Sequence, residues 1–168
     1  MGSTGGGVWQ TKDGGSNWKN ISDKYFGGSI GSVEVCPTDP LLIYVGMGEN
    51  TLRGNVSEGN GLWKSTDGGK QWKHVGLTDT RHITKIIFHP RNPDIVYCAA
   101  IGHLFGANTE RGIYKTMDGG KSWKKILFVN EEVGAVDMAI DQTNPTILYA
   151  TTWRVKRTPY SLESGGEG

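Results

Sequence analysis

Composition and net charge narrow the fold class and the kinds of partner before any motif is considered. The 168 residues include 26 Gly and 6 Pro, a density of helix breakers that argues against helical bundles, coiled coils and membrane-spanning helices. A hydrophobic fraction of 36%, with 6 Trp and 6 Tyr, is too high for a disordered chain. The net charge of +1 creates no field for a polyanion or an anionic membrane. We therefore expect a packed, turn-rich, mostly β protein with neither a nucleic-acid nor a membrane partner.

The first strong feature in chain order is a segment that recurs twice downstream. Its copies are residues 7–18, 61–72 and 112–123. Each copy has a short apolar run, then Ser or Thr, Asp, two Gly and Trp, and the three Asp lie 54 and 51 positions apart. A second marker, Asp-Pro or Asn-Pro before an apolar run, keeps the same period at residues 39–45, 92–98 and 144–150. Two markers with one period indicate an internal repeat of about 50 residues.

Each repeat divides into four short strands. Alternating apolar residues predict the first strand at 33–36, 83–88 and 135–140, and a Pro-containing turn joins it to the second strand. An Asp-Gly-Gly turn joins the third strand to the fourth, because its glycines accept positive φ angles. Four antiparallel strands at this period are typical of a propeller blade. The sequence therefore predicts an all-β fold, a β-propeller of four-stranded antiparallel blades.

The repeats give about three blade-equivalents. We expect the third and fourth strands of a first blade, two complete blades, and the first two strands of a further blade followed by a long loop. These parts correspond to residues 7–29, 30–77, 78–129 and 130–168. Three blades cannot close a ring, because propellers typically have about 4 to 8 blades. Two hypotheses follow: two copies associate into a six-bladed ring, or the chain is part of a longer propeller.

The repeated turn, Ser/Thr-x-Asp-x-Gly-x-x-Trp, resembles the Asp-box (BNR) repeat of sialidases, sortilins and related propellers. Its Asp is expected to accept backbone N–H groups and its Trp to pack between sheets, so these residues are predicted to be structural. The nine positions are Asp13, Gly15, Trp18, Asp67, Gly69, Trp72, Asp118, Gly120 and Trp123. Residues 13–17 lack the final bidentate Glu and the flanking helices of a calcium loop. No metal and no cofactor are predicted.

A second resemblance concerns the whole chain. Residues 102–106, Gly-His-Leu-Phe-Gly, and residues 153–161 resemble large exported bacterial proteins that are related to the sortilin propeller and often labelled glycosyl-hydrolase-like. This resemblance implies a secreted or periplasmic protein with an unassigned ligand, although no signal peptide is visible after Met1. Cys36 and Cys98 lie in unrelated apolar runs without Cys-x-x-Cys spacing, so we expect two buried thiols rather than a disulfide or a zinc site.

Blade topology separates two faces of the molecule. The Asp-box turns occupy one, the Asp-box face, and the loops at 49–60, 102–111 and 154–168 occupy the other, the long-loop face. Arginines there are candidates to clamp a carboxylate or sulfate, histidines to transfer protons, and aromatic residues to stack on a sugar or peptide. The candidates are Arg53, Arg81, His82, His103, Arg111, Trp153, Arg154, Arg157 and Tyr160. Surface ion pairs, capped histidines and blade packing are the structural alternatives.

Catalysis has one weak pair of candidates. Glu34 and Asp137 fall on first strands, which line a propeller channel, and two carboxylates about 5 to 10 Å apart are the requirement for glycoside hydrolysis. Lys85 is placed to pair with either. The Arg-Ile-Pro segment and the Tyr-Glu pair of sialidases are not identifiable, nor are the catalytic aspartates of xyloglucan-cleaving glycosidases. The favoured hypothesis is a binding or interaction module for carbohydrate or peptide on the long-loop face. The alternative is a fragment of a sialidase-like or xyloglucanase-like glycoside hydrolase, and a photosystem-assembly-like propeller is a third possibility that leaves no mark in the sequence.

Overall fold

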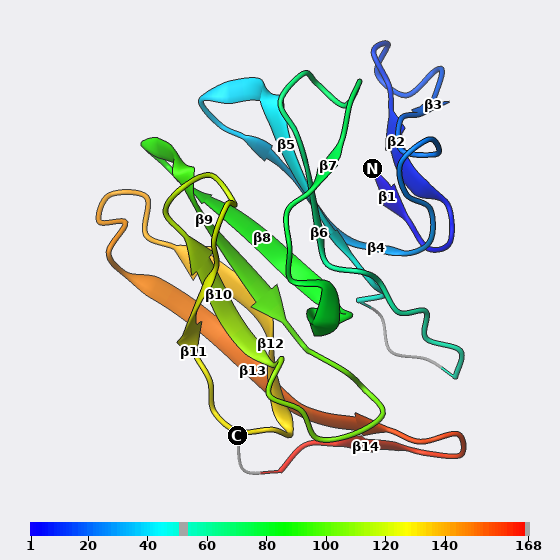
Figure 1. Ribbon diagram of the computed structural model, residues 1–168, viewed down its shortest axis with the longest axis vertical. Helices are drawn as coiled ribbons and strands as arrows, with labels where there is room; N and C mark the ends of the chain where they lie inside the picture. Colours follow the sequence, from blue (N-terminus) through cyan, green and yellow to red (C-terminus); the bar gives the residue numbers. More distant parts are fainter. Residues whose placement is uncertain (51–53, 167–168) are drawn as a thin grey trace.

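The computed structural model describes residues 1–50 and 54–166, which form four antiparallel sheets. In Figure 1 the sheets follow one another in chain order, from the blue first sheet to the orange and red fourth sheet. The first has β1 (Gly2–Ser3), β2 (Gly7–Gln10) and β3 (Lys19–Asn20). The second has β4 (Ile30–Cys36), β5 (Asp39–Met47), β6 (Leu62–Ser65) and β7 (Lys73–His74). The third has β8 (Ile83–His89), β9 (Asn92–Ala100), β10 (Gly112–Thr116) and β11 (Lys124–Leu127), and the fourth has β12 (Val133–Ile140), β13 (Leu148–Arg157) and β14 (Leu162–Ser164).

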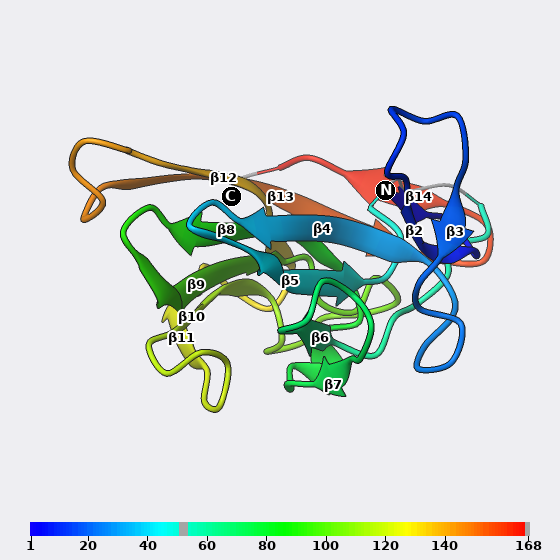
Figure 2. The ribbon, with the colours of Figure 1, turned by 90° about the horizontal axis from the view of Figure 1, so that it is seen from above.

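The second and third sheets are complete propeller blades. Their strands pair in sequence order, β4-β5-β6-β7 and β8-β9-β10-β11, as the repeat predicts. Strand β8 contacts both β4 and β12, so the first strands of successive blades lie next to each other. Figure 2 shows these strands toward one side of the molecule, with the outer strands β7 and β11 toward the other. The predicted all-β propeller fold is confirmed. Within the described residues no helix is long and apolar enough to cross a membrane, and the one helical element is a 3₁₀ turn at Thr78–Thr80.

The hydrophobic core lies between the blades. Because side chains alternate along a strand, neighbouring residues of β5 pack into different cores. Tyr44 packs with Phe88 and Trp123 between the second and third blades, whereas Val45 packs with Trp72 between the first and second. Cys36 and Cys98 are buried free thiols, and both belong to the core between the second and third blades.

Two terminal segments differ from the expectation. Residues 2–3 form β1, which pairs Gly2 with Val8 along the edge of β2, where the second strand of a complete blade would lie. Residues 154–168, expected as a loop, contain the end of β13 and the added strand β14, which pairs Val155 with Ser164. A turn closed by the side chain of Thr158, whose oxygen accepts the Ser161 N–H at 2.9 Å, joins these strands. Within residues 1–50 and 54–166, the other repeats contain no counterpart of this hairpin.

Candidate functional site

The Asp boxes are closed hydrogen-bonded turns. In the third blade the Thr116 hydroxyl donates to Asp118 at 2.7 Å and accepts the Gly120 N–H at 2.9 Å. Asp118 also accepts the Ser122 hydroxyl at 2.6 Å and the backbone N–H groups of Lys121 and Ser122 at 3.0 and 2.9 Å. These donors, led by the Ser122 hydroxyl, hold the pKa of Asp118 well below its usual range. The carboxylate is therefore occupied within its own turn.

The other two boxes repeat this arrangement. Asp67 accepts two backbone N–H groups, and its pKa is lowered for that reason. At Asp13, the side chain of Asn17 is the largest of several donors that lower the pKa to about 2. Gly69 has a φ of +86°, and a Cβ on it would lie 2.5 Å from the Ile21 side chain of the preceding blade. The geometry supports the predicted structural role of these residues.

The Asp-box tryptophans connect neighbouring blades. The indole N–H of Trp72 donates to the Ile21 carbonyl at 2.9 Å, and that of Trp123 donates to the Val75 carbonyl at 2.8 Å. Trp72 is 6% exposed, whereas Trp18 is 44% exposed, since no described sheet precedes the first. The expectation that Trp18 also packs between blades was wrong for this reason.

The Asp-box face also carries two equivalent open grooves between consecutive boxes. One lies between the first and second boxes, and Trp18, Tyr25 and Lys70 are among its lining residues. The other lies between the second and third boxes, and Lys64 and Asp94 are among its lining residues. Lys64 donates to the Gly119 carbonyl at 2.9 Å. Because repeat-equivalent residues line both grooves, their shape follows from the blade repeat.

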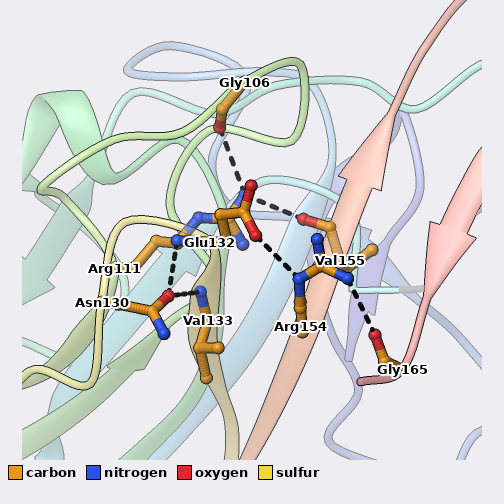
Figure 3. A network of polar contacts seen from close by, with 8 residues as sticks. All are labelled: Gly106, Arg111, Asn130, Glu132, Val133, Arg154, Val155 and Gly165. Carbon is orange, nitrogen blue, oxygen red and sulfur yellow. Dashed lines mark hydrogen bonds and ion pairs between the residues drawn. The ribbon is translucent and has the colours of Figure 1, made fainter. Parts of the chain in front are cut away.

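Arg111 organises the long-loop face from inside. Its guanidinium is 0% exposed, and Nη2 donates to the carbonyls of His103, Gly106 and Val155 at 2.8, 3.3 and 2.9 Å. Figure 3 shows two of these contacts, to Gly106 and Val155, which join the 102–111 loop to β13. Burial lowers the pKa of Arg111. Arg111 is therefore part of the loop structure, with Nε and Nη1 left without a described partner.

Arg154 forms a surface ion pair on the same face. Its Nε donates to the Glu132 carboxylate at 2.7 Å, and Nη1 donates to the Gly165 carbonyl at 3.4 Å (Figure 3). The hydrogen bond and charge of Arg154 lower the pKa of Glu132, and Glu132 raises that of Arg154. The pair holds β13 against the segment before β12, so the structural alternative applies to Arg154.

The two histidines, His82 and His103, lie in neighbouring segments of the long-loop face. His82 is 0% exposed, its Nδ1 is 3.1 Å from the Glu49 carbonyl, and its backbone carbonyl accepts the Ile101 N–H at 3.0 Å. Burial lowers the pKa of His82, although Glu49 opposes the shift. The Nδ1 contact requires a proton on that nitrogen, so in the neutral ring Nε2 is an acceptor. Nε2 of His82 and Nε2 of His103 have no described partner.

The remaining candidates are spread across the face. Arg81 makes long contacts of 3.9 Å with Glu58 and Asp79. The backbone of Arg157 donates to the Leu104 carbonyl at 2.7 Å, and a Cβ on Gly54 would lie 3.5 Å from the Arg157 Nη2. The Trp153 indole N–H donates a hydrogen bond to the Ser164 hydroxyl at 2.8 Å. Tyr160 is 97% exposed at the hairpin tip, apart from the other candidates. Arg53 lies outside the described residues.

The candidate catalytic carboxylates flank a lysine. Lys85 on β8 lies between Glu34 on β4 and Asp137 on β12, and its Nζ is 4.0 Å from Asp137. Burial raises the pKa of Glu34, and the Lys85 charge partly opposes this shift. Among the residues that the structure describes, no group of three or more His, Cys, Asp and Glu side chains is arranged to hold a metal ion.

Two residues that contribute to the loop face were not among the site candidates from the sequence. Asn108 accepts the His103 N–H at 3.2 Å and donates to the carbonyls of His103 and Gly106 at 3.0 Å. Glu49 is 2% exposed, and its carboxylate accepts the Ser57 N–H at 2.8 Å. A charged residue directly after the apolar run of β5 is the one signal that the sequence offers for Glu49.

The comparisons with known proteins agree with this fold. Residues 6–162 match the Sortilin-Vps10 family, described as "Sortilin, neurotensin receptor 3". The sequence matches none of the curated proteins. An ancestral GH74 enzyme is similar in structure, with a TM-score of 0.67 and 21% identity over 90% of this chain and 20% of that one. The GH74 xyloglucanase from Xanthomonas campestris gives 0.66 and 18% over 98% and 26%. The GH74 enzyme of Niastella koreensis gives 0.61 and 17% over 96% and 27%. The chain thus spans between 20% and 27% of the length of these enzymes.

Proposed function

Because this chain belongs to the Sortilin-Vps10 family, we propose that it is a propeller binding module whose long-loop face takes a carbohydrate or peptide ligand without converting it. A secreted or periplasmic location is part of the same proposal. Its support is the distribution of unsatisfied polar atoms. In the described part of the chain, seven buried side-chain nitrogen or oxygen atoms have no partner, and six of them belong to predicted loop-face residues. They are Nε of Arg81, Nε2 of His82, Nε2 of His103, Nε and Nη1 of Arg111, and Nε of Arg157.

The chemistry of these atoms favours a particular ligand class. A buried donor or acceptor without a partner costs about 1–3 kcal/mol, so a site that retains several is suited to a ligand that supplies the missing groups. Arginine nitrogens donate only, whereas neutral His82 accepts at Nε2. A hydroxyl group satisfies both needs, and a carboxylate adds charge complementarity to the arginines. Among the two ligand classes, an acidic carbohydrate therefore fits best.

A glycan array with neutral, uronic and sulfated members, together with a displayed peptide library, tests this proposal on the purified protein. His103→Ala and Arg157→Glu should each weaken the strongest binder by about tenfold, since each removes one polar contact to the ligand. Lys70→Glu and Lys121→Glu change the charge of the Asp-box face in the same way and serve as controls. An equal loss of ligand affinity in the two lysine controls would contradict the assignment to the long-loop face. A loss of affinity in the lysine controls alone would contradict it as well.

A glycoside hydrolase fragment is the second candidate, and the raised pKa of Glu34 favours it. A carboxyl whose pKa is raised by burial is better suited to protonate a leaving group, with Asp137 as the second carboxylate. Incubation with xyloglucan oligosaccharides and sialosides tests for product release. Glu34→Gln and Asp137→Asn should each abolish release, while Glu131→Gln on an exposed loop should not. The absence of release by the unmodified protein would exclude these substrates.

A further inference from the structure

The 102–111 loop presents one large apolar side chain to solvent. Leu104 is 0% exposed and packs with Ile101 and Val155. The next residue, Phe105, is 53% exposed. Figure 1 shows this light-green loop beside the orange and red β13–β14 hairpin. A single exposed apolar side chain is ordinary on a protein surface, so exposure alone does not make Phe105 part of a site.

The backbone on both sides of Phe105 is fixed by hydrogen bonds. The His103 carbonyl accepts Arg111 Nη2 at 2.8 Å and Asn108 Nδ2 at 3.0 Å. The Gly106 carbonyl accepts the same two groups at 3.3 and 3.0 Å. Two donors use both lone pairs of each carbonyl oxygen. The turn that carries the Phe105 ring is therefore ordered before any ligand arrives, which lowers the entropy cost of binding to it.

The surface next to Phe105 is kept bare by a glycine. A Cβ built on Gly106 would have no atom of the described residues within 4 Å, its chain neighbours aside, and the φ of Gly106 lies outside the left-handed region. Gly102 differs, because its φ is +77° and its Cβ would lie 2.6 Å from the Arg111 side chain. Folding thus explains the glycine at 102. At 106 the lack of a side chain leaves room for a ligand to approach.

Polar groups without a described partner accompany this turn. They are Nε2 of His103 and Nε of Arg157. The backbone N–H of Arg157 donates to the Leu104 carbonyl at 2.7 Å, which keeps the guanidinium within one side-chain length of the residue before Phe105. An apolar or aromatic surface bordered by a few polar groups is the usual composition of a small-molecule site.

We infer that Phe105 is the stacking residue of the long-loop face and takes the C–H face of a pyranose ring in an acidic carbohydrate. This inference rests on the proposed function and names the side chain that contacts the apolar part of the ligand. A pyranose ring combines an apolar C–H face with hydroxyl groups at its edge, which fits an aromatic ring bordered by nitrogen donors and acceptors. An extended peptide fits less well, because it needs free backbone groups and the carbonyls of His103 and Gly106 are already taken.

Three substitutions at position 105 test stacking on the purified full chain, with the same glycan array and titration of the strongest acidic glycan in solution. Phe105→Ala removes the ring and should lower affinity by about tenfold or more. Phe105→Leu keeps an apolar side chain without a flat ring and should lower affinity nearly as much, whereas Phe105→Trp should retain binding. Tyr149→Ala removes another exposed aromatic ring, near the Asp-box end of β13, and should leave affinity unchanged.

Gly106→Val tests the bare surface separately. The added side chain meets no described atom and needs no unusual φ, so thermal unfolding should be nearly unchanged. Affinity for the same glycan should fall by about tenfold, because the side chain occupies the space next to Phe105. Gly27→Val is the matched control, since a Cβ on Gly27 also meets no described atom within 4 Å. Full binding by a folded Gly106→Val protein would overturn the inference.

The remaining outcomes separate this inference from the proposed function. If His103→Ala and Arg157→Glu weaken glycan binding but Phe105→Ala does not, the face binds carbohydrate without stacking and only the inference fails. Equal binding by Phe105→Leu and the unmodified protein would show an unspecific apolar contact and overturn the inference in the same way. A peptide as the strongest binder would also overturn it alone. Binding of no glycan and no peptide would overturn both.

Discussion

The Asp-box face and the long-loop face use polar side chains in opposite ways. On the Asp-box face, the Asp118 carboxylate takes its hydrogen bonds from its own turn, and Asp13 and Asp67 repeat the arrangement. On the long-loop face, buried nitrogens of Arg111 and His82 remain without a described partner. The most regular residues of the sequence therefore hold the blades together. The described polar atoms without a partner belong mostly to residues that differ between repeats.

The largest loss of stability that tests this comparison is expected at the Trp of the second Asp box. Trp72→Ala should lower the free energy of unfolding by about 3–5 kcal/mol, because it removes a buried indole from between two blades. The same substitution at exposed Trp18 should change it by about 0.5 kcal/mol. Denaturant unfolding of both variants measures the difference. Equal losses would mean that the motif alone, rather than the neighbouring blade, determines the energy.

A second variant tests whether the long-loop face also contains structural residues. Arg111→Met should lower the free energy of unfolding by about 2–4 kcal/mol, since three carbonyl groups lose a charged donor. Lys121→Met on the Asp-box face removes the same charge from an exposed site and should change it by about 0.5 kcal/mol. If Arg111→Met left the unfolding curve unchanged while weakening ligand binding, Arg111 would belong to the site alone.

The turn hydroxyl of the Asp box should have a smaller effect. Thr116→Val removes the acceptor of the Gly120 N–H and a donor to Asp118, both in a buried turn. We expect a loss of about 1–3 kcal/mol in unfolding free energy, which chemical denaturation can measure. Thr11→Val makes the same change in the more exposed first turn, where water replaces the lost contacts. A larger loss for Thr11→Val would contradict this dependence on burial.

The smallest expected effect is a pH dependence of stability that differs between the two faces. The depressed pKa of His82 means that the unfolded chain binds a proton before the folded chain does, so unfolding free energy falls as pH drops below about 6.5. The depressed pKa values of Asp13 and Asp118 contribute stability that is present above about 3.9 and lost as pH falls further. Melting temperatures from pH 7.5 to 3 should therefore show two regions of decline. His82→Gln should remove the upper region, and its persistence would exclude His82 as the cause.

The sequence predicted the blades well because their markers recur at one period. The turns around Asp67 and Asp118 specify a hairpin locally, and alternation in β8 specifies its two packed sides. The β13–β14 hairpin escaped prediction because residues 154–164 have no counterpart in the other repeats. The exposure of Trp18 depends on whether a blade precedes it, which a local motif does not encode. The burial of Arg111 depends in part on the Val155 carbonyl of β13, 44 residues away in sequence.

The two cysteines in the core between the second and third blades make the separation of these blades measurable by thiol reactivity. Burial raises the pKa of the Cys98 thiol, so in the closed protein it is almost entirely protonated and unreactive toward disulfide reagents. Reaction requires the two blades to part, and its rate then reports the free energy of that local opening. The propeller thus carries a natural probe of how often neighbouring blades separate, with no added label.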